Sequence, residues 1–144
     1  KKVDLNTVKK IPYHDNFFDV VWLTDVIEHV FWPDFLLHEV NRVLKKNGLL
    51  ILTTPNVSWY IIRFRLLFGH TLKDIHPEHI HWFNKRQLET SLINNQFIIK
   101  EISSYIRLIP YPVTNRFPAL NLLNHIGKPS SLFSHSYAIL AHKK

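Results

Sequence analysis

Several residue types and segments are missing or scarce in this sequence, and each absence excludes a class of protein. The 144 residues contain no cysteine, which excludes a disulfide framework and thiolate metal sites and fits a reducing compartment. No apolar run approaches the roughly 20 residues that cross a bilayer, and no segment reads as a secretory signal. We therefore expect a cytoplasmic protein.

Methionine is also absent, and there are only three glycines. Together these two facts predict that the N-terminal part of a longer protein precedes Lys1. We accordingly expect either a missing N-terminal half or a homo-oligomer to complete the molecule.

The bulk composition is that of a globular domain. Hydrophobic residues make up 46% of the chain and charged residues 20%, and a chain of this length buries roughly two thirds of its unfolded surface. The formal charge of +7 would attract nucleic acid, anionic lipid or a phosphorylated substrate. Because the basic residues are scattered, a solubilising role is the commoner interpretation.

A strand, a helix and a second strand follow one another between residues 17 and 53. Residues 17–23 form an apolar run typical of a central parallel strand covered on both faces. Pro33 and Asp34 then signal a helix start, and Asn47 and Gly48 signal its end. Residues 49–53 read as a second buried strand, so the segment predicts a right-handed βαβ unit and an α/β fold.

The rest of the chain adds fewer elements. Residues 86–94 read as a helix capped by Asn84, and residues 97–106 and 136–141 as strands. We expect one domain over residues 1–144, with lid or substrate insertions at residues 57–83 and 107–134.

Polar residues follow both strands of the βαβ unit. Residues 24–29 and 54–56 lie at strand carboxyl ends, where open α/β sheets bind their ligands. They should face one site, to which Asn56 would bring a substrate contact.

Three stretches carry a family resemblance: DLNTVKKIPYHDNFFDVVWLTDVIEHV, LLHEVNRVLKKNGLLILTTPN and HIHWFNKRQLETSLINNQFIIKEI. In combination they resemble the C-terminal portion of a class I S-adenosylmethionine-dependent methyltransferase, of the group that includes the ubiquinone-pathway O-methyltransferases. The resemblance implies a partial Rossmann-like sheet with a C-terminal antiparallel strand pair. It also implies methyl transfer from S-adenosylmethionine.

The resemblance places the cofactor's adenine beside Asp4 and Leu5, as an acceptor and a backbone donor for the adenine edge. Thr24 and Asp25 would border the cofactor at the end of the first strand. The family's glycine-rich loop and its ribose-binding acid have no counterpart in this sequence. The chain therefore carries half of a cofactor site.

Asp25, Glu28 and His29 form an acidic cluster whose side chains would converge if the strand end turned into helix. The spacing resembles the magnesium ligands of some ubiquinone-pathway enzymes and of RNA 3′-terminal 2′-O-methyltransferases. A further ligand would be His79 or His81, which share a face if the segment is extended and which would otherwise contact the substrate. Alternatively His29 and Glu28 act in catalysis without a metal, with histidine as general base, or the cluster only orders the loop.

The aromatic and basic segment at residues 59–68 has three interpretations: a lid helix, a surface for a lipid-bearing substrate or membrane, or a nucleic-acid contact. The function that we expect is methyl transfer to an oxygen of a small-molecule, lipid or glycan-precursor acceptor. One alternative is a metal-dependent RNA 3′-end methyltransferase. Another is a non-catalytic or split half that binds a partner chain.

Overall fold

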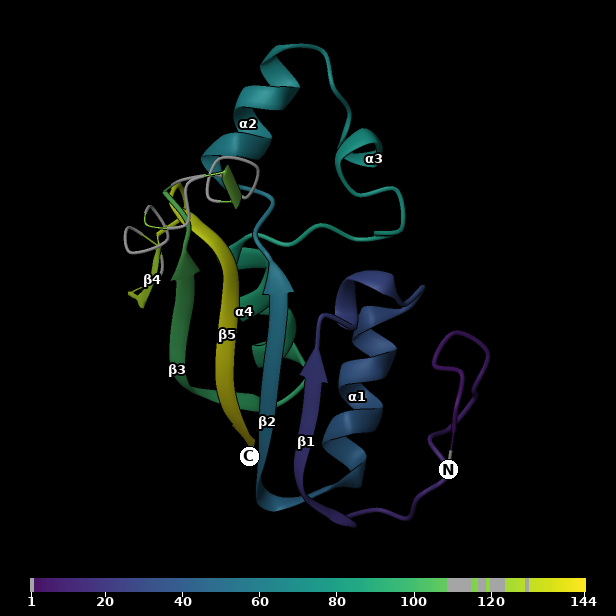
Figure 1. Cartoon of the computed structure of the whole chain (residues 1–144). Helices are drawn as coiled ribbons and strands as arrows, with labels where there is room; N and C mark the ends of the chain where they lie inside the picture. The colour runs from purple at the N-terminus through teal and green to yellow at the C-terminus, as the bar shows by residue number, and fades with distance from the viewer. Residues whose placement is uncertain (1, 109–114, 117–118, 120–123, 129) are drawn as a thin grey trace.

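The computed structural model describes residues 2–108, 115–116, 119, 124–128 and 130–144. Within them, five strands form one open sheet in the order β1-β2-β5-β3-β4 (Figure 1). The strands are β1 (Phe18–Thr24), β2 (Leu44–Pro55), β3 (Phe97–Ile106), β4 (His125–Gly127) and β5 (Ser134–Lys143). The helices are η1 (Ile27–His29, a single 3₁₀ turn), α1 (Pro33–Val43), α2 (Tyr60–Leu67), α3 (Leu72–Ile75) and α4 (Lys85–Asn94).

β1 and β2 pair in parallel, whereas β5 runs antiparallel to both β2 and β3. This arrangement confirms the α/β class and the C-terminal antiparallel strand pair.

The βαβ unit is β1, α1 and β2. α1 begins at Pro33, whose missing N–H costs nothing at the first position of a helix. Its apolar residues recur at helical spacing and are buried against the sheet. The helix ends at Val43, earlier than the predicted stop at Asn47, because Leu44 already pairs with Phe18 of β1.

α4 covers the same face of the sheet as α1. Its first turn is fixed by a capping box, in which the Gln87 amide donates to Asn84 and the Asn84 amide donates to Gln87. Leu88 and Leu92 then pack into one core with the buried face of α1. This core holds β1 and β2 side by side, and so fixes the strand ends that carry the candidate site.

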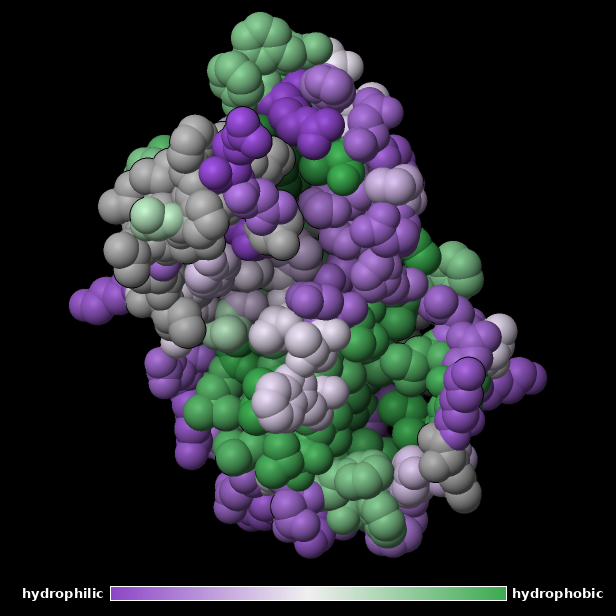
Figure 2. Space-filling model, viewed as in Figure 1, coloured by the Kyte–Doolittle hydropathy of each residue, from purple (hydrophilic) through white to green (hydrophobic). Residues whose placement is uncertain are grey.

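The opposite face of the sheet carries no helix among the described residues. On this face Val20 and Trp22 of β1 lie beside Leu49 and Ile51 of β2, and Trp22 is 68% exposed. Figure 2 shows this side as a mainly hydrophobic surface. The prediction that the first strand is central and covered on both faces is therefore wrong for the described part of the chain, where β1 is the edge strand.

Residues 57–83 leave the sheet at the end of β2 and carry α2 and α3, which lie beyond the strand ends in Figure 1. Much of the segment at residues 107–134 lies outside the described residues. The division into one domain with two insertions stays a prediction. Within the described parts of the chain, none of the helices has the length and apolar character needed to span a membrane.

Candidate active site at the ends of β1 and β2

The chain turns sharply where β1 ends. Asp25 has a φ of 49°, in the left-handed region that aspartate tolerates better than most residues. Its amide donates to the backbone oxygen of Thr53 at 3.1 Å, and its Oδ1 accepts from the Thr53 hydroxyl at 3.0 Å. Thr24 beside it is exposed. β2 therefore holds the turn that presents Thr24 and Asp25 at the strand ends.

Glu28 lies at the centre of the cluster and is 1% exposed. Its Oε2 accepts from the Thr54 hydroxyl at 3.0 Å. Among the described residues, Oε1 has no hydrogen-bond partner. Burial raises the pKa of this carboxyl, and the nearby negative charge of Asp25 adds to the shift. Glu28 is thus a buried acid with one oxygen available to a ligand or proton.

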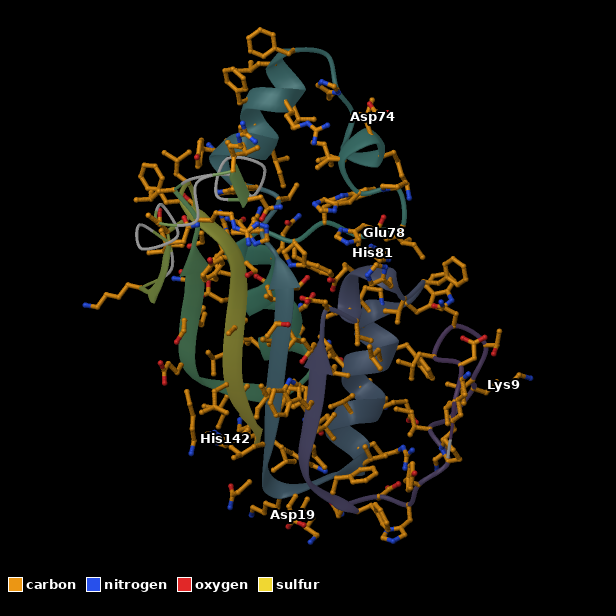
Figure 3. The ribbon with its side chains drawn as sticks, viewed as in Figure 1. Lys9, Asp19, Asp74, Glu78, His81 and His142 are labelled. Atoms are coloured by element: carbon orange, nitrogen blue, oxygen red, sulfur yellow. The ribbon has the colours of Figure 1, made fainter. Side chains whose placement is uncertain are left out.

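A loop that precedes α4 closes over Glu28. The amides of Ile80 and His81 both donate to the Glu28 backbone oxygen, at 2.9 and 3.0 Å. The His29 ring contacts the Glu78 backbone oxygen through Nδ1 at 3.2 Å. Figure 3 shows Glu78 and His81 beside the turn that follows β1. These backbone contacts bring the histidines of this loop, which are His76, His79 and His81, to the strand ends.

His79 is buried against His29 and His76. Its ring meets the His29 ring edge to face at 4.8 Å between centroids, and stacks on the His76 ring at 4.4 Å. Burial lowers the pKa of His79, and the neighbouring His76 lowers it further. The Glu78 carboxylate lies 3.5 Å from His79 Nε2, and the pKa of Glu78 is lowered by a bond to its own backbone and by the surrounding histidines.

Two overlapping groups of side chains have the spacing of metal ligands. Glu28, His29 and His79 offer ligand atoms within 4.8 Å of one another, as do His76, Glu78 and His79. The predicted ligand Asp25 is in neither group, because its carboxylate is engaged by Thr53. The structure thus brings together three of the four predicted ligands.

His81 lies apart from these groups. Its Nε2 contacts the Phe31 backbone oxygen at 3.3 Å, and residues 79–81 do not form a strand. The expectation that His79 and His81 share one face is therefore wrong. Of these two histidines, only His79 belongs to the groups with metal-ligand spacing.

Asn56 anchors the loop that includes Ser131 and enters β5 at Ser134. It is fully buried, its amide nitrogen donates to the backbone oxygens of Ser131 and Ser134, and its Oδ1 accepts from the Ser58 amide. Because these bonds occupy the side chain, the structure assigns Asn56 to loop anchoring and not to the predicted substrate contact.

Asp4 and Leu5 lie at the start of the described chain. Asp4 is exposed, and its carboxylate accepts from the Asn6 amide at 2.9 Å and from the Thr7 hydroxyl at 3.1 Å. Asn6 in turn accepts from the Phe31 amide at 2.7 Å, which fastens this loop to the segment after η1. The loop therefore lies beside the strand-end site, with Leu5 packed against the core.

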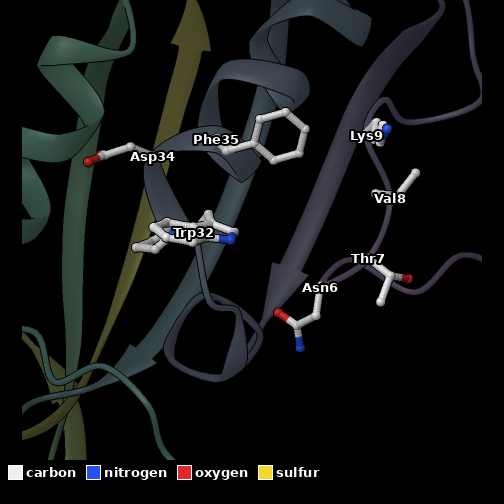
Figure 4. Close-up of a pocket in the computed structure, with 8 residues that line it drawn as sticks. Asn6, Thr7, Val8, Lys9, Trp32, Asp34 and Phe35 are labelled. Atoms are coloured by element: carbon white, nitrogen blue, oxygen red, sulfur yellow. The ribbon is translucent and has the colours of Figure 1, made fainter.

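Two hollows flank the cluster. A cavity of about 660 Å³ lies between residues 6–9 and the start of α1. In Figure 4 Trp32 and Phe35 lie on one side of it and the loop with Val8 and Lys9 on the other, whereas the Asp34 carboxylate points away. A second cavity of about 300 Å³ lies on the open face of the sheet and is lined by Asp25, Thr53, Tyr105 and His135 among others.

The smaller cavity contains a titratable residue that sequence reasoning missed. Burial, with the neighbouring Arg107 charge, lowers the pKa of His135 to about 4. His135 follows the segment at residues 107–134, so no strand or motif signal placed it near Asp25. The loop histidine His76 and the carboxylate of Glu78 were marked only by the crowding of histidines in HPEHIH.

Comparisons with known proteins agree with this fold. Residues 2–52 match the methyltransferase-domain family. A ubiquinone biosynthesis O-methyltransferase of Bradyrhizobium diazoefficiens is 28% identical over 99 residues, which are 66% of this chain and 39% of that protein. A structure of an S-adenosylmethionine-dependent methyltransferase from Thermotoga maritima, described as a possible histamine N-methyltransferase, superposes with a TM-score of 0.69 at 20% identity. The superposition covers 94% of this chain and 60% of the Thermotoga chain.

The chain has the fold of the class I methyltransferases. A shorter match, 44% identical over 48 residues, is to a glycine/sarcosine/dimethylglycine N-methyltransferase of Actinopolyspora halophila, covering 33% of this chain and 8% of that protein. The chain thus spans well under half the length of these two curated relatives, one an O-methyltransferase and the other an N-methyltransferase.

The family that residues 2–52 match implies S-adenosylmethionine, and the residues present fit one end of this cofactor. Asp4 and Leu5 offer an acceptor and a backbone donor for an adenine edge beside the turn at Thr24 and Asp25. At the methionine end the fit fails, because none of the three glycines lies in a strand-to-helix turn: Gly48 is within β2, Gly69 follows α2, and Gly127 ends β4. The described residues therefore fit the adenine side of such a cofactor site and not its methionine side.

Proposed function

We propose that the chain forms the acceptor-side part of an S-adenosylmethionine-dependent methyltransferase, and that the methyl group passes to an oxygen of a small molecule, lipid or glycan precursor. The observation that carries the proposal is the polar cluster around Glu28 and His29, at the carboxyl ends of two parallel strands in a class I methyltransferase fold. Ligands of open α/β sheets bind at such ends.

The residues divide between two tasks. When bound, S-adenosylmethionine supplies an electrophilic methyl group on a sulfonium. Asp4 and Leu5 hold the adenine edge, and Thr24 and Asp25 border the cofactor where β1 ends. Aligning the acceptor oxygen with the methyl group is the main catalytic task that remains.

His29 is suited to take the proton of an acceptor hydroxyl. The Glu78 backbone oxygen can only accept, so Nδ1 of a neutral His29 carries the hydrogen and Nε2 keeps a free lone pair. The ring is half-buried and therefore reachable. His29 Nε2 would take the proton of the acceptor hydroxyl while the methyl group leaves the sulfonium, whose C–S bonding electron pair stays on sulfur.

In an enzyme preparation that contains both sides of the cofactor site, the test is transfer of tritium from methyl-labelled S-adenosylmethionine into fractionated cell extract, assayed as small-molecule, lipid and RNA pools. We expect label in the small-molecule or lipid pool, and loss of roughly a hundred-fold in rate in His29→Asn. His38→Gln, an exposed histidine of α1, serves as control and should keep full activity. Equal rates in both variants would remove His29 from the mechanism, and no transfer at all would favour a non-catalytic binding module.

The ligand spacing favours a second candidate, a cation-dependent form of the same reaction. The unpaired Glu28 Oε1 and the rings of His29 and His79 form a mixed oxygen and nitrogen set, which suits a borderline cation such as Mn²⁺ or Zn²⁺ better than Mg²⁺. A cation there would bind the acceptor hydroxyl and lower its pKa. In this form the acceptor could include the ribose of an RNA end.

Measuring cation binding directly distinguishes the cation-dependent form from the form in which His29 is the base. Calorimetric titration with Mn²⁺ or Zn²⁺ should give one site in the native protein and none in His79→Ala if the cation form is right, and chelator should abolish methyl transfer. Heat of binding that His79→Ala leaves unchanged would contradict the cation form. Activity that survives chelator would leave His29 as the base.

A further inference from the structure

Three large apolar side chains gather on the exposed side of α2 and on the residue that follows it. Phe64, Leu67 and Phe68 are 59%, 83% and 69% exposed. Their spacings of three and four place them on one helix face, and the rings of Phe64 and Phe68 lie 4.6 Å apart. We call these three residues the α2 tip.

The α2 tip is held away from the body of the protein. Figure 1 shows α2 projecting beyond the ends of the strands, and Figure 2 shows a hydrophobic cap at that extremity. The base of the helix is anchored, because Ile62 and Trp59 are buried and the Trp59 indole donates to the Arg107 backbone oxygen at 3.1 Å. The helix therefore presents its apolar residues outward on a fixed support.

Positive charge flanks the α2 tip on both sides. Arg63 and Arg65 adjoin Phe64 in sequence, and within the described ranges neither guanidinium lies within 4 Å of a carboxylate. The nearby Asp74 carboxylate is engaged by the amide and hydroxyl of Thr71, at 2.6 and 2.8 Å. The arginines are thus available to an external anion.

Apolar residues that project between two arginines match the chemistry of an anionic lipid surface. Leucine and phenylalanine enter the acyl boundary, and arginine side chains reach the phosphates. Nucleic acid fits less well, because Leu67, the most exposed of the three, has no ring on which a base could stack. We propose that the α2 tip inserts into the surface of an anionic lipid bilayer, with Arg63 and Arg65 at the lipid phosphates.

Vesicle flotation tests the proposal. The purified protein is mixed with vesicles of phosphatidylcholine alone, or with roughly one third phosphatidylglycerol. We expect binding to the anionic vesicles, a loss of at least about ten-fold in the double variant Leu67→Ser/Phe68→Ser, and a similar loss in Arg63→Gln/Arg65→Gln. Ile93→Ser, which removes a 62% exposed apolar residue of α4, should bind as the native protein does.

Several outcomes would overturn the proposal. Binding that the tip variants leave unchanged would do so, as would absence of binding to anionic vesicles by native protein whose melting curve shows it to be folded. Self-association that depends on Leu67 and Phe68 without vesicle binding would assign the tip to a second copy of the chain. A gel shift with RNA lost in Arg63→Gln/Arg65→Gln, again without vesicle binding, would assign it to nucleic acid.

Discussion

At the scale of single residues, the site is built from side chains whose charges are constrained by burial. Glu28 keeps one oxygen unpaired in the core, and His79 and His135 lie where a positive charge is disfavoured. The sequence placed Asp25, Glu28 and His29 in a cluster at a strand end and left the further ligand open between His79 and His81. It could not show that Asp25 would turn to Thr53 or that Asn56 would be fully bonded, since both depend on contacts between distant segments.

Replacing Glu28 with glutamine should stabilise the fold, and more so at high pH. Since the folded-state pKa of Glu28 is raised, the native state holds its proton over a pH range where the unfolded state has released it, so native stability falls as pH rises through that range. Below the ordinary pKa the variant and native protein should differ little. Above the raised pKa we expect Glu28→Gln to be more stable by about 1 kcal/mol in urea unfolding. A variant that is less stable at neutral pH would show that the carboxylate is favourably bound.

His135 should make the protein sensitive to mild acid. Its pKa is lowered from 6.5 to about 4, so its contribution is fully present above pH 6.5 and is lost as the pH falls through that window. The native protein should lose up to about 3 kcal/mol more unfolding free energy than His135→Asn between these limits. Chemical unfolding at a series of pH values measures the difference. Parallel curves for the two proteins would contradict the assignment.

At the scale of elements, local sequence signals predicted several of the helices and strands that pack together in the fold. α4 begins at its Asn84 cap and β3 spans the predicted residues 97–106. α3 went unpredicted because one turn has no periodicity to detect. The end of α1 and the exposure of β1 were misjudged, since strand pairing and edge position depend on which other strands are present.

Substituting the Asn84 cap tests whether this local signal stabilises α4. Removing the Asn84 side chain leaves the Gln87 amide without its acceptor, so Asn84→Ala should lower the free energy of unfolding by about 1 kcal/mol. Thr90→Ala, on the exposed side of the same helix, should change it by less than about half that amount. Thermal or urea unfolding followed by circular dichroism measures both. Equal effects would show that the capping box does not stabilise the helix.

At the scale of the whole molecule, the open sheet face is the feature that sequence patterning could not place. The apolar run that forms β1 suits a strand covered on both sides, yet only the face toward α1 and α4 is covered by the described residues. The structurally similar Thermotoga chain is longer than this one, which spans 60% of it. Within the described residues, no helix covers the open face and no further strand pairs with the outer edge of β1.

We expect this face to bind the hydrophobic dye ANS in the folded protein. Trp22→Gln should lower the dye fluorescence markedly while changing the unfolding free energy by less than about 0.5 kcal/mol, because Trp22 is mostly exposed. The Leu67→Ser/Phe68→Ser variant reports separately on dye bound at the α2 tip. Dye fluorescence that is absent, or that Trp22→Gln leaves intact, would indicate that the face is covered in solution.

We propose that residues at the ends of β1 and β2, with the loop at Asp4, form one side of a methyltransferase cofactor site. The most direct test is a ¹H–¹⁵N NMR titration of the protein with S-adenosylhomocysteine and, separately, with adenosine. We predict that both ligands shift the amide signals of Asp4, Leu5, Thr24 and Asp25, and do so with similar affinity, because this chain contacts the adenine end. Shifts confined to the cavity between residues 6–9 and α1, or no shifts with either ligand, would contradict the account.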